Sequence, residues 1–209
     1  MSKKNLIKKF HLYAIVDRDS VKGDKIFKIA EAAVSAGADM LELRDKSSSA
    51  FEIIKTAGVL KKITKKYGVP LVINDRLDAA LAIDADGLHI GRGDIDISLA
   101  RTLMGRNKLI GVTIKNLKDA HEAKRKGADY LGVGPIFKTP IKPGIKPKGI
   151  RLLNAVKKVN MPFFAIGGID CANIKKLTER GFKRIAVIRA LCKAKVPYIA
   201  ARKLKEALF

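Results

Sequence analysis

The sequence predicts a compact (β/α)8 barrel, and three observations lead to this fold class. Short apolar runs alternate with segments of helical period from one end of the chain to the other. Eight such strand–helix units share 209 residues, which leaves about 26 residues for each unit and little room for insertions. Glycine follows several helical segments just before the next apolar run, as in the SAGADML and RKGADYL stretches, where it caps a helix. We therefore expect residues 1–209 to form a single barrel domain.

The eight predicted strands are short, and several are apolar throughout, which is typical of parallel strands buried on both faces. They span residues 11–17, 40–44, 70–75, 87–91, 109–114, 130–137, 163–168 and 184–190. An open, doubly wound sheet is the alternative architecture. It is disfavoured because no GxGxxG sequence, the dinucleotide-binding fingerprint, follows the first strand.

The helical segments between the strands carry their apolar residues on one face. In the segment 24–37, Ile26, Ile29 and Ala33 share a face, and the segment 48–67 repeats the pattern. These helices are expected to pack their apolar faces on the barrel.

Composition excludes several classes of protein. Hydrophobic residues make up 47% of the chain, which is too many for a disordered protein. No apolar run reaches the roughly 18–20 residues that span a bilayer, and the basic start lacks the apolar region of a secretory signal. Cys171 and Cys192 show no CxxC spacing, so we expect free thiols in the cytoplasm. Neither a membrane nor a zinc site is predicted.

The net charge of +23 raises the question of nucleic-acid binding. The lysines of the chain are spread in pairs over the predicted helices rather than gathered in one stripe, and aromatic residues make up only 6% of the chain. We therefore expect loose, salt-sensitive contact with polyanions and no specific nucleic-acid partner.

Polar or glycine-rich residues gather where the predicted strands end. Seven of the eight strands end this way, for example at ELRDK (42–46), NDR (74–76) and HIGRGD (89–94). The carboxyl ends of barrel strands meet at one rim, where the active sites of such barrels lie. The sequence therefore predicts one shared site at this rim.

Three cations at this rim suit a polyphosphate. Arg44 and Lys46 alternate along one strand end and so share a face, and Lys142 can approach from the Pro/Lys-rich loop 138–148, close to Asn74. Arginine and lysine side chains both bind phosphate oxygens. The alternative is a ring of salt bridges between these cations and the carboxylates of Glu42, Asp45 and Asp75.

Two carboxylates beside these cations, Asp75 and Asp94, suggest a magnesium site, because Mg²⁺ takes oxygen ligands from carboxylates and phosphates together. The alternative role of Asp75 is to cap a helix at 76–83. Asp96 or Ser98 can cap the helix that follows, which leaves Asp94 for the metal.

A second anion site is predicted at the last two strand ends. Gly167 and Gly168 follow one strand, and Ile188 and Arg189 end the next, where backbone amides of such barrels commonly hold phosphate. Thr139 can add a hydroxyl. Two anion sites and no catalytic triad fit a reaction that joins two phosphorylated small molecules and releases one phosphate group.

Five ordered motifs resemble the thiamine-phosphate synthase family, also called thiamine-phosphate pyrophosphorylase. They are ELRDK (42–46), INDR (73–76), ADGLHIGRGD (85–94), ADYLGVGPIFKTPIK (128–142) and AIGGI (165–169), and the resemblance runs over residues 12–191. It implies a (β/α)8 barrel, a transferase that joins 4-amino-5-hydroxymethyl-2-methylpyrimidine diphosphate to a thiazole phosphate, and Mg²⁺ as cofactor. Pyrophosphate would leave first, before the thiazole nitrogen attacks a pyrimidine cation.

The resemblance also implies site residues. Catalysis would fall to Arg44, Lys46 and Lys142, and the metal to Asp75 and Asp94. The substrates would be held by Glu42, Leu43, Arg44, Asp45, Lys46, Asn74, Thr113, Thr139, Pro140, Ile141, Lys142, Gly168, Ile188 and Arg189.

The chain departs from the family pattern at five positions. Glu42 replaces a glutamine, Asp45 a glutamate, Arg92 a glutamine, Ile141 a threonine and Arg189 a serine. A carboxylate at position 42 would repel a diphosphate unless it pairs with Arg44 or a metal ion.

Two other functions stay open. One is the related thiazole tautomerase, which commonly carries a histidine where this chain has Pro135 and tends to lose the aspartate found here at Asp75. The other is a degenerate, polyanion-binding barrel. A homo-oligomer is compatible with the sequence.

Overall fold

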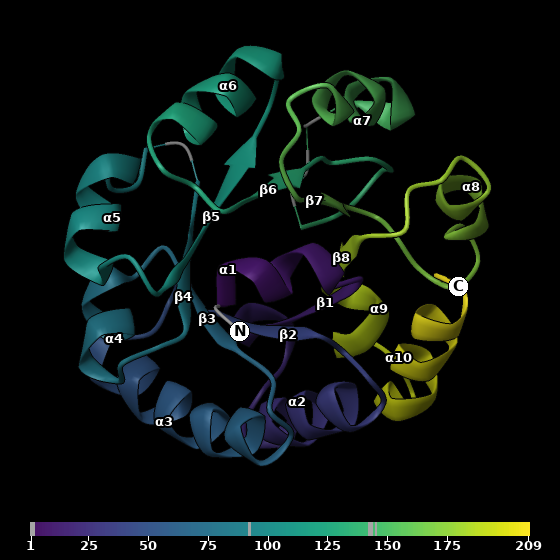
Figure 1. Cartoon of the computed structure of the whole chain (residues 1–209). Helices are drawn as coiled ribbons and strands as arrows, with labels where there is room; N and C mark the ends of the chain where they lie inside the picture. The colour runs from purple at the N-terminus through teal and green to yellow at the C-terminus, as the bar shows by residue number, and fades with distance from the viewer. Residues whose placement is uncertain (1–2, 92, 142–143, 145) are drawn as a thin grey trace.

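The computed structural model is a closed barrel of eight parallel strands in sequence order, as Figure 1 shows. It describes residues 3–91, 93–141, 144 and 146–209. The strands are β1 (Leu12–Asp17), β2 (Met40–Arg44), β3 (Leu71–Asn74), β4 (Gly87–Ile90), β5 (Leu109–Ile114), β6 (Tyr130–Val133), β7 (Phe163–Ile166) and β8 (Ile185–Val187). The predicted fold class is therefore confirmed, and the open sheet is excluded by the pairing of β8 with β1.

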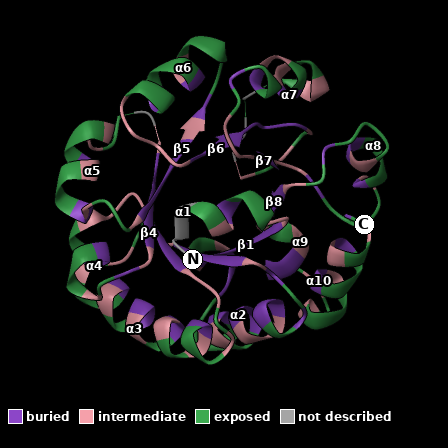
Figure 2. Cartoon of the chain, in the orientation of Figure 1, coloured by how far each residue is buried: buried purple, intermediate pink, exposed green. Residues whose placement is uncertain are grey.

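Helices surround the barrel and turn their polar faces outward, so that their outer surfaces are exposed while the strands are buried (Figure 2). The helices of the described residues are α1 (Lys3–Leu6), η1 (Ile7–Lys9), η2 (Arg18–Ser20), α2 (Lys25–Ser35), α3 (Ala50–Lys66), α4 (Leu77–Ala82), α5 (Ile97–Met104), α6 (Leu117–Arg125), α7 (Gly149–Lys157), α8 (Lys175–Thr178), α9 (Arg189–Cys192) and α10 (Pro197–Glu206). None of the helices in these described ranges is long and apolar enough to cross a membrane.

Side-chain caps fix where several helices begin. Ser49 and Glu52 form a reciprocal capping box at the start of α3. Asp96 caps α5, because its Oδ1 accepts hydrogen bonds from the backbone amides of Ser98 (2.8 Å) and Leu99 (3.3 Å). The predicted capping role of Asp96 is thus confirmed.

Alternate residues of each strand point into the barrel and form its inner core. This core is made of Ile7, Tyr13, Ile15, Met40, Val72, Leu109, Tyr130, Phe164 and Ala186. The residues between them pack on the helices in a second, larger cluster. Ile7 of η1 is only 1% exposed and joins the inner core, next to the start of β1. Figure 1 shows α1 lying across the barrel opening.

Five strands end earlier than predicted: β3 and β4 by one residue, and β6, β7 and β8 by two to four residues. β6 ends at Val133 because Pro135 has no N–H to donate, and the chain then bonds to the end of β7 through the amide of Ile136 and the carbonyl of Ile166 (3.0 Å). β7 ends at Ile166 because Gly167 turns the chain with a φ of +100°. β8 ends at Val187, and α9 follows.

Candidate active site

Polar side chains occupy the last inward-facing positions of the barrel strands. The inner core residues Ile15, Met40, Val72 and Leu109 set the alternation. Counting on in steps of two along each strand reaches the polar residues Asp17, Arg44, Asn74 and Thr113. The predicted gathering of functional residues at the carboxyl rim therefore follows directly from strand alternation.

Arg44 is held by carboxylates of the first strand end. Its Nη1 forms an ion pair with Oδ1 of Asp17, whose side chain is 1% exposed, and lies 3.4 Å from Oδ2 of Asp19. Asp17 and Arg44 are paired residues of β1 and β2, which explains the contact. These partners differ from the predicted carboxylates at positions 42, 45 and 75. The guanidinium is fixed at the rim and keeps further N–H groups for a ligand.

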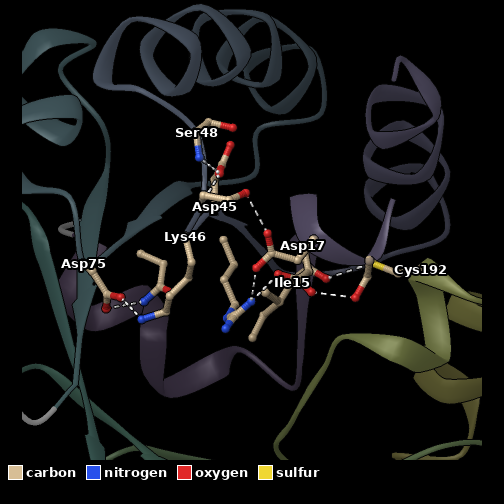
Figure 3. A network of polar contacts seen from close by, with 12 residues as sticks. Ile15, Asp17, Asp45, Lys46, Ser48, Asp75 and Cys192 are labelled. Atoms are coloured by element: carbon tan, nitrogen blue, oxygen red, sulfur yellow. Dashed lines mark hydrogen bonds and ion pairs between the residues drawn. The ribbon is translucent and has the colours of Figure 1, made fainter. Parts of the chain in front are cut away.

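Lys46, Asn74 and Asp75 form a second polar group, and Figure 3 shows Lys46 and Asp75 facing each other. The ammonium group of Lys46 contacts Oδ2 of Asp75, and Nδ2 of Asn74 donates to Oδ1 of Asp75 (2.7 Å) and to the carbonyl of His89 (3.1 Å). Asp75 has a φ of +60°, in the left-handed region that few side chains adopt. This backbone conformation turns the chain at the end of β3 and places the carboxylate between a cation and an amide.

Asp75 does not cap α4. The residue at the cap position is Arg76, and no side chain makes a capping hydrogen bond there. The carboxyl of Asp94 accepts a hydrogen bond from the amide of Gly91 (2.7 Å). Burial raises the pKa of Asp75, and the neighbouring Asp94 carboxyl raises it further while Lys46 opposes both. The two carboxyls therefore repel each other across a short distance.

Glu42 is buried at 3% exposure and accepts a hydrogen bond from the hydroxyl of Tyr13. Burial raises the pKa of Glu42 to about 8, and the Tyr13 hydrogen bond only partly offsets this. The carboxyl is therefore protonated at neutral pH and carries no charge that would repel a diphosphate. The raised pKa adds protonation to Arg44 and a metal ion as a means of relieving this repulsion.

A chain of polar contacts runs from Glu42 across the barrel interior to the rim. The hydroxyls of Tyr13 and Tyr130 lie 3.0 Å apart, and Nδ1 of His89 lies 3.2 Å from the Tyr130 hydroxyl. Nε2 of His89 then lies 2.8 Å from Oγ1 of Thr113. We call these five residues the interior polar chain. Sequence reasoning gave no role to three of its members, the two tyrosines and His89.

Glycine makes room for this chain. A Cβ on Gly111 would overlap the ring and hydroxyl of Tyr130 and Nδ1 of His89. The glycine in the middle of β5 therefore serves the packing of two aromatic side chains from β4 and β6.

A cavity of about 340 Å³ opens on the opposite side of the rim, at the ends of β6, β7 and β8. The predicted residues that line it are Thr113, Thr139, Pro140, Ile141, Gly168, Ile188 and Arg189. A side chain at Gly168, whose φ is +69°, would overlap the carbonyl of Lys138 and the side chain of Phe137. Only glycine fits this turn, and the backbone itself forms the wall of the cavity.

Two predicted site residues, Leu43 and Asp45, do not stand at the rim in the expected way. The side chain of Leu43 is 1% exposed and packs in the outer core, so only its backbone can approach a ligand. Oδ1 of Asp45 accepts hydrogen bonds from the amides of Ser47 (3.3 Å) and Ser48 (3.0 Å), which orders the loop after β2. Lys142 lies outside the described residues, as does Arg92.

Comparison with known proteins is consistent along the whole chain. Residues 12–191 match the family model of thiamine monophosphate synthase. The thiamine-phosphate synthase of Clostridioides difficile (strain 630) is 44% identical over 195 residues, or 93% of each chain. That of Syntrophomonas wolfei is 41% identical over 199 residues, covering 94% of this chain and 95% of the relative.

A solved structure agrees with these relatives. Thiamine phosphate pyrophosphorylase from Pyrococcus furiosus superposes with a TM-score of 0.88 at 34% identity and covers 98% of both chains. A 3-hexulose-6-phosphate synthase, with a TM-score of 0.69 at 20% identity, shares the fold alone. The chain therefore belongs to the thiamine monophosphate synthase family, as its sequence motifs predict.

Proposed function

We propose that this rim joins a pyrimidine diphosphate to a thiazole phosphate with the help of Mg²⁺. Family membership makes the chain a transferase that forms thiamine phosphate and acts on small phosphorylated molecules. Within that reaction, the rim divides into a diphosphate site, a metal site and a thiazole phosphate site. The juxtaposition of Lys46, Asp75 and Asp94, which follow the ends of β2, β3 and β4, is the single observation that carries the assignment.

The diphosphate of the pyrimidine substrate is assigned to Arg44, Lys46 and Asn74. Arg44 is anchored by Asp17, so its guanidinium is already placed before the substrate arrives. Lys46 can exchange its contact with Asp75 for one with a phosphate oxygen, because its side chain is 49% exposed. Lys142 of the family motif is assigned to the same group.

The donor set fits Mg²⁺. Asp75 and Asp94 supply two carboxylates, and within the described residues no cluster of three or more histidine, cysteine, aspartate or glutamate side chains exists. Mg²⁺ is commonly held by one or two carboxylates, with water and substrate phosphates as its other ligands. When bound, the ion neutralises the charge that builds up on the leaving pyrophosphate. It would also relieve the repulsion that raises the pKa of Asp75.

The phosphate of the thiazole substrate is assigned to the cavity at the ends of β6, β7 and β8. Thr139, the backbone at Gly168 and the segment Ile188–Arg189 line it. Arg189 is exposed at the start of α9, which lets it reach an anion without filling the cavity.

The bond changes need positioning and charge stabilisation more than proton transfer. The carbon–oxygen bond to the diphosphate breaks, and pyrophosphate leaves with the electron pair. The thiazole nitrogen then uses its lone pair to form a bond to the methylene carbon. Arg44 and Lys46 stabilise the charge on the leaving group, which agrees with a rim that holds no catalytic triad among its described residues.

An assay with the purified chain tests this function. Both substrates with Mg²⁺ should give equal amounts of thiamine phosphate and pyrophosphate, and omission of either substrate should give neither. Failure to form thiamine phosphate in the complete mixture would contradict the assignment. We place the reaction in the cytoplasm, which is supported by the free thiols of Cys171 and Cys192.

A further inference from the structure

We propose that a groove at the amino-terminal end of the barrel binds a nucleoside triphosphate. This groove, which we call the basal groove, has a volume of about 580 Å³ and lies where β7 and β8 begin, next to Lys8 and His11. The active-site rim lies at the other ends of the same strands. The proposal concerns a separate site and does not depend on the reaction assigned above.

Four cations line the basal groove, and none of its described lining residues carries a carboxylate. They are Lys8 within η1, Lys157 at the end of α7, and Lys183 and Arg184 just before β8. In the part of the chain that the structure describes, none of these four forms an ion pair, whereas Lys66, Lys108 and Lys126 elsewhere are paired with carboxylates. Their charges therefore add up over one hollow, and this attracts an anion.

Arg184 is held in place at the edge of the groove. Its guanidinium donates a hydrogen bond to the backbone carbonyl of Lys8, which ties the segment before β8 to the N-terminal segment. Burial lowers the pKa of Arg184. A half-buried guanidinium with a carbonyl as its partner lacks a counter-charge, and a phosphate would supply one.

One part of the groove wall is apolar and includes the ring of Phe163, whereas the ring of Phe182 beside it is only 6% exposed. Met161 and Phe163 are half-buried, and the rings of Phe163 and Phe182 lie 6.3 Å apart at an angle of 55°. They give a planar heterocycle a surface to pack on. Nδ1 of His11 lies 2.8 Å from the carbonyl of Lys183 and donates a hydrogen bond to it, which fixes the ring at the edge of the groove.

Size and charge together select the class of ligand. A hollow of this volume falls within the range of small-molecule sites, roughly 300–1,000 Å³. The cations surround a hollow rather than follow a stripe, which favours a compact ligand over a nucleic-acid strand. Four positive charges match the charge of a triphosphate better than that of a monophosphate.

Titration calorimetry with ATP and the full chain, without Mg²⁺ and at near-physiological salt, tests the proposal. We expect saturable binding at one site. The double variant K157E/K183E should lose at least tenfold in affinity. The charge-matched control K62E/K118E, which changes exposed lysines on the outer helices α3 and α6, should stay within twofold of the wild type. Circular dichroism and pyrophosphate release should be normal in both.

Two further titrations show which parts of ATP are bound and whether ATP binds at the basal groove or at the active-site rim. ATP should bind more tightly than tripolyphosphate and AMP, because only ATP uses both the aromatic wall and all four cations. ATP should bind the Arg44→Ala variant as it binds the wild type, which shows that it does not occupy the active-site rim.

Four results would overturn the proposal. No heat with ATP would exclude the site. An equal loss of ATP affinity in both double variants would show that ATP is attracted diffusely by the net charge of +23. Loss of binding in Arg44→Ala would place ATP at the rim. Equal affinity for tripolyphosphate and ATP would show that the aromatic wall plays no part.

Discussion

The hydroxyl of Tyr13 donates a hydrogen bond to Oε2 of Glu42 inside the barrel, and this contact anchors the interior polar chain. Both residues are buried, and burial raises the pKa of Glu42 to about 8. The resemblance of the sequence motifs to the family implies glutamine at this position. A protonated carboxyl resembles a glutamine side chain in shape and charge, so Glu42 at neutral pH preserves the arrangement of the family.

Replacement of Glu42 by glutamine should change how stability depends on pH. Folded chains keep the Glu42 proton up to about pH 8, whereas unfolded chains release it near pH 4.5. The folded state therefore binds more protons between these values, and the wild-type free energy of unfolding should fall as pH rises through this window. In E42Q this part of the fall should be absent. Urea unfolding at pH 5, 7 and 8.5 measures the free energy of unfolding, with the exposed Glu122→Gln as control. If the free energy depends on pH equally in the two variants, the raised pKa of Glu42 is refuted.

Removal of the Tyr13 hydroxyl should destabilise the barrel. In Tyr13→Phe, the groups of Glu42 and Tyr130 that it contacts lose a buried partner, at a cost of about 1–3 kcal/mol. The exposed Tyr198→Phe should change stability by less than about 0.5 kcal/mol. Chemical denaturation of both variants gives the comparison. A Tyr13→Phe chain as stable as the wild type would show that the interior polar chain contributes little.

Gly111→Ala tests the packing of the same chain. The added methyl group would overlap Tyr130 and His89, and we expect a loss of about 1–3 kcal/mol. Gly58→Ala is the matched control, since a methyl group there meets no atom within 4 Å and Gly58 lies inside α3. It should stabilise by up to about 1 kcal/mol. The melting temperatures should therefore move in opposite directions, and a parallel shift would contradict the packing argument.

Asp94→Ala should abolish Mg²⁺-dependent turnover and leave the circular dichroism spectrum native. Asp94 is exposed, and its removal breaks a loop hydrogen bond to Gly91 and the contact with the Asp75 carboxyl, so the fold should survive. Loss of one metal ligand should lower kcat/KM by about 100-fold or more. Asp78→Ala, on the exposed face of α4, is the control and should retain activity. Unchanged turnover in Asp94→Ala would remove this residue from the metal site.

Arg189→Ser should selectively weaken binding of the thiazole phosphate. If Arg189 contacts that phosphate, its loss should raise the KM for the thiazole substrate by about tenfold, while the KM for the pyrimidine diphosphate stays the same. Arg151→Ser, on the exposed surface of α7, should change neither. Steady-state kinetics with each substrate varied in turn decide the matter. An unchanged or lower KM for the thiazole substrate would show that Arg189 does not assist its binding.

Strand periodicity predicts the barrel well, and it fails mainly at the strand ends. β6 ends just before the Gly134–Pro135 pair, β7 ends where Gly167 adopts a positive φ, and β8 ends where α9 begins, and an apolar pattern registers none of these. Resemblance to the family identifies the rim residues. The partners of those residues depend on how the strands are aligned with one another.

Arg44 and the interior polar chain show this dependence. Arg44 meets Asp17 because the two are paired across β1 and β2, and no local pattern gives that alignment. Polar residues inside apolar strands, such as Glu42 and His89, were the available signal for the interior polar chain. Its connections became visible only when the closed barrel brought five strands together.

The alternation that sends Val72 into the core sends Asn74, two residues later, to the rim. A core residue and a rim residue therefore lie on the same strand, in successive layers of inward-facing side chains. An engineer who randomises only the outermost layer changes which molecules the enzyme accepts and leaves the supporting layer intact. The rim residues of this barrel can therefore be exchanged without rebuilding the core residues beneath them.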